Sequence, residues 1–193
     1  LIADIQYCDV DNINSRHYRN SLPKLKSAID DLNRTDLDFI VNLGDLIDKD
    51  FESFDPVMNT LDRSKHKLFH IPGNHDFSVR RKYKKDVKKM LTGDSSYYSF
   101  SKDGFRFIFL NTCEISTYAG SRKASRKAGR ILEELQEKAS PNAFDWNGDI
   151  STEQAEWFKS ELSGAKNRNE KVLVFSHHPV LPPGTHSVYR WQR

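Results

Sequence analysis

The chain has 193 residues, a mild net charge of +3, 30% charged residues and 37% hydrophobic residues. This length suits one well-buried core, and the gathering of apolar residues in short runs excludes a disordered chain. No apolar stretch approaches the ~20 residues that span a bilayer, and no signal peptide is recognisable, so we expect a cytoplasmic protein without a membrane partner. The positive charge comes mostly from one local block, so it does not indicate specific binding to nucleic acid.

The two cysteines, Cys8 and Cys113, each follow a candidate strand and do not have the spacing of a zinc finger. We expect two reduced, partly buried thiols, and a disulfide is the alternative.

The first half of the chain predicts strands that alternate with helices. Apolar residues at helical spacing predict a helix that begins near Ser21, because Pro23 is tolerated only in a first turn. Strand, helix and strand at this spacing indicate a parallel sheet. The predicted elements are a strand at 1–5, a helix ending near 32, a strand from Phe39, a helix at 54–62 and a strand at 68–71.

The second half predicts a sheet that becomes antiparallel. Asp103-Gly104 lies between two β-rich runs and indicates a hairpin, and Ser151 is a candidate N-cap. A charged helical segment around 118–140 indicates a helical insertion into the domain, and two prolines and a glycine at 182–184 indicate a loop. We expect a single domain over 1–193, with strands at 96–100, 105–110 and 171–176 and a helix from 151 to about 162.

A strongly basic block covers 80–90, where Lys or Arg stands at most positions. The expected form is a helix with a solvated basic face, and a phosphate-binding patch is the alternative.

Polar side chains with ligand chemistry follow four of the apolar runs. Carboxyl ends of strands are where ligands bind in open α/β sheets, so we expect these side chains to converge. Carboxylate, amide and imidazole ligands together suit Mn²⁺, Fe or Zn²⁺ better than Ca²⁺. The four pairs are Asp4 and Gln6, Asp45 and Asp48, Asn74 and His75, and His177 and His178.

Each of these side chains also has a structural explanation when it is taken singly. Asp4 could be a surface residue, Asp48 a helix cap, and Asn74 the residue of a left-handed turn. His75 and His178 could be core histidines with satisfied hydrogen bonds. Four such pairs in order favour a metal site, and the lack of a nucleophilic cysteine with a partner base or a Gly-rich phosphate loop favours hydrolysis by activated water.

Four motifs together resemble the calcineurin-like metallophosphoesterases: Asp4-x-Gln6, Gly44-Asp45-x-x-Asp48, Gly73-Asn74-His75-Asp76 and His177-x-Pro179. The usual first motif of that family is Asp-x-His, and here Gln6 replaces the histidine. With the segment 16–22 and Asn147-Gly148, this substitution looks like the manganese-dependent ADP-ribose/CDP-alcohol diphosphatase branch.

The resemblance implies a four-layer α/β/β/α sandwich with two divalent metal ions. Mn²⁺ is the first choice, and Fe or Zn²⁺ are alternatives. It implies that Asp45 bridges the metals, that Asp4 and Gln6 bind one of them, and that Asn74 and His177 bind the other.

The resemblance also implies the groups that act on the substrate. His75 would face the scissile phosphate as general acid or charge stabiliser, and Asp76 would orient His75 through a hydrogen bond. Arg16 and Arg19 are candidates for the substrate phosphates, and salt bridges on the first helix are the alternative for both.

The family's last motif, Gly-His-x-His, is not found in this sequence, because Gly184-Thr185-His186-Ser187 has one histidine only. We therefore expect a C-terminally incomplete fold that lacks about two strands and the last metal ligands. The expected activity is metal-dependent hydrolysis of a phosphoanhydride in a small nucleotide diphosphate conjugate. Another phosphodiesterase or phosphomonoesterase of the superfamily, or a non-catalytic scaffold, is the alternative.

Overall fold

The computed structural model describes residues 1–180 and 186–189. The chain divides into two compact units, Leu1–Leu91 and Thr92–Arg193, and each is a mixture of helices and strands. The predicted α/β class is thus confirmed. No helix in the described part of the chain is long and apolar enough to cross a membrane. The predicted loop at 182–184 lies outside the described residues.

The first unit contains a parallel pair of strands, as predicted. Strand β1 (Ile40–Asn42) pairs with β2 (Leu68–His70) in parallel register, with Val41 opposite Phe69. The remaining elements are the helices α1 (Ser21–Leu32), α2 (Phe54–Leu61) and α3 (Lys84–Thr92) and the 3-10 turns η1 (Tyr18–Asn20), η2 (Phe51–Ser53), η3 (His75–Phe77) and η4 (Arg81–Tyr83).

The N-terminal run forms less strand than predicted. Residues 1–7 follow β1 and its loop through hydrogen bonds such as Ile2 N to Val41 O at 2.9 Å and Tyr7 N to Leu46 O at 3.1 Å. Only isolated bridges form, because the backbone is left-handed at Asp4 (φ 53°) and Gln6 (φ 46°), which breaks a regular strand.

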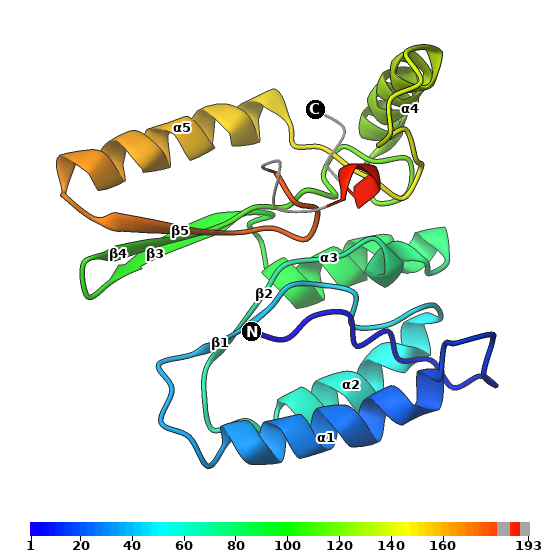
Figure 1. Ribbon diagram of the computed structural model, residues 1–193, viewed down its shortest axis with the longest axis vertical. Helices are drawn as coiled ribbons and strands as arrows, with labels where there is room; N and C mark the ends of the chain where they lie inside the picture. Colours follow the sequence, from blue (N-terminus) through cyan, green and yellow to red (C-terminus); the bar gives the residue numbers. More distant parts are fainter. Residues whose placement is uncertain (181–185, 190–193) are drawn as a thin grey trace. The chain divides into compact units, whose positions relative to one another are not determined.

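Helices α1 and α2 pack side by side in the first unit (Figure 1). Leu25 and Ile29 of α1 lie one helical turn apart and are buried, as are Phe54, Val57 and Leu61 of α2. This spacing of three and four residues is what buries one face of each helix. These buried faces form part of the core of the first unit.

Within the described residues, the second unit contains a three-stranded sheet in the order β3-β4-β5. Strands β3 (Tyr98–Lys102) and β4 (Phe105–Phe109) form the predicted hairpin, and β5 (Lys171–Phe175) pairs with β4 in parallel. Helix α5 (Thr152–Asn167) runs along one face of this sheet (Figure 1) and continues past the predicted end. The predicted insertion forms helix α4 (Arg122–Glu137), and the short turn η5 covers Ser187–Tyr189.

Strand β5 presents apolar side chains to solvent. Val172, Leu173 and Val174 keep 36%, 44% and 37% of their accessible surface. Among the described residues β5 pairs with β4 only, so it is an edge strand of the kind that can accept another strand.

Two smaller predictions are also confirmed. Cys8 and Cys113 are free buried thiols. From Lys84 on, the basic block forms helix α3, on which Lys85, Lys88 and Lys89 are exposed, as a solvated face requires. The phosphate-binding alternative stays a prediction.

We predict a pH-dependent stability that arises at His70. Burial lowers the pKa of His70 to about 4, and its Nδ1 lies 3.3 Å from the Asn42 side-chain nitrogen, which donates to neutral imidazole. The unfolded chain binds this proton near pH 6.5 and the folded chain does not. Stability is therefore complete above pH 6.5 and falls as the pH drops from 6.5 to about 4, by up to about 1.4 kcal/mol per pH unit.

Urea unfolding at a series of pH values in this window measures the effect. His70→Gln should reduce the pH slope but not remove it, because protonation of His178 also lowers stability in this range, and His17→Gln, at an exposed histidine, should leave the slope unchanged. An unaltered pH slope in His70→Gln would contradict the prediction.

Candidate metal centre

A buried carboxylate, Asp76, ties together the two loops that follow β1 and β2. Its Oδ2 accepts hydrogen bonds from the backbone N–H of Asp45 (3.0 Å) and Gly73 (2.9 Å). Its Oδ1 accepts from the N–H of Leu46 at 2.8 Å and of Ile47 at 3.4 Å. Asp76 has no exposed surface, so this carboxylate holds both predicted ligand loops in one place.

The same two loops meet at a pair of glycines. Gly44 has a φ of +98°, and a Cβ at this position would lie 2.4 Å from the backbone nitrogen of Gly73. Neither the conformation nor the space admits a side chain. Glycine before Asp45 is therefore a condition for the close approach of the loops.

Three of the predicted metal ligands converge in the first unit. The Gln6 side-chain nitrogen lies 3.2 Å from Asp45 Oδ2 and 3.5 Å from Asp4 Oδ1, and the backbone N–H of His75 donates to Asp45 Oδ1 at 2.8 Å. Asn74 directly precedes His75 in the chain, and its role as a ligand stays a prediction. Asp4, Gln6 and Asp45 all have positive φ values, a form of backbone strain that gathers at functional sites.

The donor set fits divalent cations. Among the described residues, no group of three or more His, Cys, Asp and Glu side chains is arranged to hold a metal. The cluster instead combines the carboxylates of Asp4 and Asp45 with the amide of Gln6, whose oxygen and nitrogen exchange by a simple flip. A cation between these groups would replace the amide nitrogen as the partner of both carboxylates and would take the amide oxygen as a ligand.

His75 is paired with Asp48. The His75 Nδ1 lies 2.8 Å from Asp48 Oδ1, and Arg16 Nη1 donates to that same oxygen at 2.9 Å. The side chain of Asp48 is only 8% exposed, so its charge is poorly screened by water. The arrangement keeps a proton on Nδ1 and leaves Nε2 as the nitrogen available to a substrate.

The prediction that Asp76 orients His75 is corrected by these contacts. The carboxylate beside His75 Nδ1 is that of Asp48, and the oxygens of Asp76 accept from the backbone of the loops. The sequence places Asp76 next to His75, but adjacent residues in a 3-10 turn direct their side chains differently.

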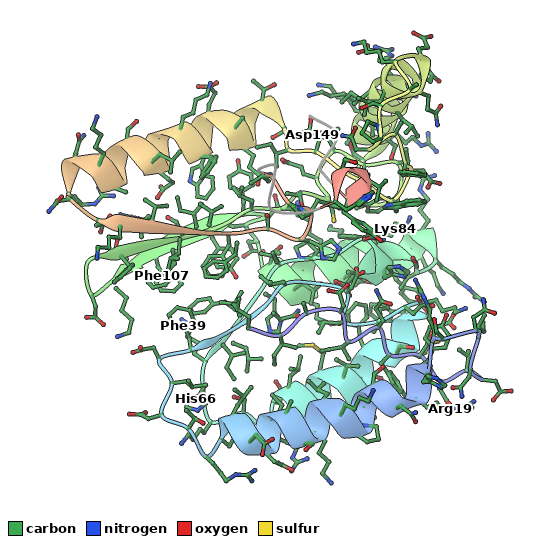
Figure 2. The ribbon with its side chains drawn as sticks, in the orientation of Figure 1. Arg19, Phe39, His66, Lys84, Phe107 and Asp149 are labelled. Carbon is green, nitrogen blue, oxygen red and sulfur yellow. The ribbon has the colours of Figure 1, made fainter. Side chains whose placement is uncertain are left out.

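Arg19 makes surface ion pairs, and Arg16 reaches the candidate centre. Arg19 lies near the start of α1 (Figure 2), with its Nε 2.5 Å from Asp9 and its Nη1 2.7 Å from Asp11. Arg19 thus makes salt bridges, although its partners precede the first helix, and a contact of Arg19 with the substrate stays a prediction. Arg16 also makes an ion pair, but with Asp48, so it stays a candidate for contact with the substrate.

In the second unit, His178 is a core histidine and His177 is not fully buried. The backbone N–H of His178 donates to Thr112 Oγ1 at 3.1 Å, its Nδ1 lies 3.0 Å from that oxygen, and its Nε2 lies 3.0 Å from Trp146 O. Burial, aided by His177, lowers the pKa of His178 to about 3. Its two nitrogens are thus occupied, which leaves His177 as the predicted ligand of this segment.

The sequence prediction missed an aromatic surface beside this segment. Trp146 is 41% exposed and stacks on Phe144, with ring centroids 4.1 Å apart and an angle of 14°. Its backbone is held by His178, and the next residues pack closely, since a Cβ on Gly148 would lie 2.2 Å from Thr112 O. The signal in the sequence is Phe-x-Trp directly before the Asn147-Gly148 turn.

Comparison with known proteins agrees with this geometry. The profile of the calcineurin-like phosphoesterases matches residues 1–193. A Xenopus laevis protein named manganese-dependent ADP-ribose/CDP-alcohol diphosphatase is 32% identical, over 94% of this chain and 65% of its own length. A Mus musculus protein of the same name is 30% identical, over 97% of this chain and 68% of its own length.

A solved structure has the same fold. The crystal structure of a dimetal phosphatase from Danio rerio superposes with a TM-score of 0.82 at 26% identity, and covers 98% of this chain and 72% of its own. The present chain therefore spans about two thirds of the length of the relatives that it matches.

We predict that Asp76→Asn loosens both ligand loops. The amide would place a donor where backbone N–H groups also donate, so we expect a loss of about 2–3 kcal/mol in the free energy of unfolding. Mn²⁺ binding should weaken by about 10–100-fold, as for other groups that orient ligands. Urea unfolding and isothermal titration with Mn²⁺ measure the two effects.

Asp86→Asn, on the exposed face of α3, is the matched control and should stay within about 0.5 kcal/mol of the wild type. If Asp76→Asn kept the wild-type stability and Mn²⁺ affinity, the role assigned to this carboxylate would be wrong.

Proposed function

The chain belongs to the calcineurin-like phosphoesterase family, and from that premise we propose that it hydrolyses a phosphoanhydride in a nucleotide diphosphate conjugate. The observation that carries this proposal is the convergence of Asp4, Gln6 and Asp45 beside the His75–Asp48 pair. A carboxylate and amide cluster next to a histidine with one bound nitrogen suits metal-assisted transfer of a phosphoryl group to water.

The metals would be two divalent cations, Mn²⁺ in the first place with Fe or Zn²⁺ as alternatives. The names of the relatives and of the solved structure support this choice. Asp45 would contact both cations, Asp4 and Gln6 one of them, and Asn74 and His177 the other. When bound, the cations lower the pKa of a coordinated water and neutralise charge on the phosphoryl oxygens.

The residues of the chain supply position and protons. Asp48 holds the proton of His75 on Nδ1, so that Nε2 can hydrogen-bond to the scissile phosphate or its leaving oxygen. Arg16, at the same carboxylate oxygen, can offer its other guanidinium donors to a second phosphate. Two groups that can each contact a phosphate, His75 Nε2 and the Arg16 guanidinium, suit a diphosphate better than a single phosphate.

A nucleotide as the substrate is supported by the names of the relatives, ADP-ribose/CDP-alcohol diphosphatases. A non-catalytic scaffold is less consistent with the site, because a scaffold does not need the His75–Asp48 pair.

A substrate panel tests the proposal. With Mn²⁺, we expect hydrolysis of ADP-ribose or CDP-choline to exceed that of cyclic AMP, and Asp45→Asn to lower kcat/KM about 100-fold or more by removing the shared ligand. Metal analysis should find Mn²⁺ in the wild type and less of it in the variant. Equal activity in both proteins would defeat the assignment, and preference for cyclic AMP would favour a phosphodiesterase.

A further inference from the structure

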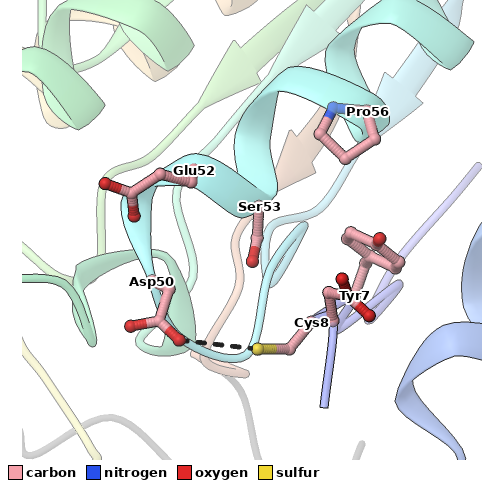
Figure 3. A pocket seen from close by; sticks show the side chains of 7 residues that line it. Tyr7, Cys8, Asp50, Glu52, Ser53 and Pro56 are labelled. Atoms are coloured by element: carbon pink, nitrogen blue, oxygen red, sulfur yellow. Dashed lines mark hydrogen bonds between the residues drawn. The ribbon is translucent and has the colours of Figure 1, made fainter.

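Helix α4 in the second unit has a charge pattern that the described part of the chain does not satisfy. In the first unit, by comparison, the Cys8 thiol of the pocket between the segments 7–9 and 50–56 (Figure 3) has its partner in Asp50, at 3.8 Å. The first nine residues of α4 include five basic side chains and no acidic one, and the last five include three glutamates and no basic one. Positive charge at the N-terminus and negative charge at the C-terminus both oppose the helix dipole and destabilise a helix.

One exposed row of α4 contains Arg122, Arg126, Gly129, Glu133 and Glu137, and we call it the charged row. Steps of three and four residues place these positions along one face of the helix. The two arginines stand at i and i+4, as do the two glutamates, so each pair of like charges repels. None of the four charged side chains forms an ion pair within 4.0 Å among the residues that the structure describes.

Gly129, at the middle of the charged row, has no packing reason within the described chain. A Cβ at this position would have no atom within 4 Å, and the backbone φ is not positive. Glycine inside a helix is destabilising relative to alanine, so its presence here has a cost without a benefit inside the chain. What glycine does offer is a surface that another backbone can approach closely.

The other faces of α4 are directed toward the protein itself. Ala128 is fully buried, so the apolar face is covered. Hydrogen bonds from its own backbone and from Ser151 lower the pKa of Glu153, and Lys127 and Lys123 add to that lowering, so these lysines lie on the flank near the start of α5. The helix packs along no other described helix or strand and lies away from the sheet of its unit (Figure 1). The charged row is the face that remains for a partner.

We propose that the charged row pairs with the same row of a second copy of this chain, with the two α4 helices antiparallel about a twofold axis beside Gly129. Residues 126 and 133 are equally distant from that axis, and so are residues 122 and 137. Arg126 therefore lies opposite the partner's Glu133, and Arg122 lies opposite the partner's Glu137. Each pair occurs twice, as in any interface with this symmetry.

Charge complementarity favours a second copy over other partners. An antiparallel copy places its acidic half on the basic half of α4 and its basic half on the acidic half, so both halves are neutralised together. A polyanion such as nucleic acid would match the basic half only and would be repelled by Glu133 and Glu137. The inference does not depend on the proposed hydrolysis.

The dimer should be weak and sensitive to salt. One pair of helices is a small interface, and exposed ion pairs stabilise little, so we expect a Kd of about 100 µM at low salt. At about 0.5 M NaCl the Kd should rise about tenfold or more, because salt screens exposed charges. Sedimentation velocity over a range of chain concentrations measures both values.

Arg126→Glu and Glu133→Arg test the pairing directly. Each variant alone sets like charges opposite one another and should weaken self-association about tenfold or more. An equimolar mixture of the two should associate as the wild type does, because the carboxylate introduced at position 126 of one chain opposes the guanidinium introduced at position 133 of the other. Lys127→Glu, on the flank near Glu153, is the matched control and should keep the Kd within about threefold.

Gly129→Gln separates association from folding. The new side chain meets no atom of the chain, and glutamine favours a helix over glycine, so Tm should rise by about 2–4 °C. The same side chain would hold the two helices apart, so the Kd of the dimer should rise about tenfold. Thermal unfolding and sedimentation measure the two effects on one sample.

Loss of association in each charge variant and its recovery in the mixture support the inference. A wild type that stays monomeric, a mixture that associates no better than either variant alone, or a Kd that Gly129→Gln leaves unchanged overturns it. A monomeric chain whose α4 NMR signals shift on addition of heparin would assign the basic half to a polyanion and overturn it as well.

Discussion

The hydrogen bonds of Asp76 to the backbone are the constraint on which the candidate centre depends. Two strands of a parallel sheet can end side by side without bringing their following loops together. Here one buried carboxylate accepts from Asp45 and Leu46 on one loop and from Gly73 on the other. Because glycine stands where the loops touch, the backbones approach closely enough for a single side chain to bridge them. The ligands are thus positioned by a residue that need not bind metal.

The local signals of the sequence predicted most elements of both units. The helix that begins at Ser21 follows from Pro23 in the first turn, and the hairpin follows from Asp103-Gly104, both with positive φ. The N-terminal strand was predicted from apolar residues alone, and the pattern contains no sign of the left-handed backbone at Asp4 and Gln6. That strain depends on the neighbouring loop, to which this segment is hydrogen-bonded.

For the site as well, the sequence predicted which residues take part better than it predicted which residues contact one another. Motif spacing predicted which residues gather, and Asp4, Gln6 and Asp45 do lie together. The family resemblance implied that Asp76 orients His75, and this was wrong, since Asp48 holds that place. Both carboxylates are near His75 in the chain or the sheet, and the direction of a carboxylate depends on the turn that carries it. Trp146 was missed for a related reason, since its exposure depends on the packing of the 144–148 loop against Thr112 and His178.

Asp48 contacts two side chains with different expected functions, proton transfer and phosphate binding. One of its oxygens contacts both His75 and Arg16, so the position of the group that handles protons is coupled to that of a group suited to phosphate. A change in the Arg16 contact would alter the hydrogen bond that orients the imidazole. Substrate recognition and proton transfer are in this sense linked through one atom.

The parallel pairing of β4 with β5 has a consequence for how the second unit folds. Phe105 pairs with Lys171, and the whole of α4 and α5 lies between them in the chain. The β3–β4 hairpin can form from local contacts, but the third strand can join only after a long loop closes. Closure entropy grows slowly with loop length, so an insertion such as α4 lowers equilibrium stability little. It raises the contact order, however, and folding rates fall as contact order rises. During synthesis the aromatic β3–β4 hairpin therefore stays partly uncovered until β5 pairs with β4.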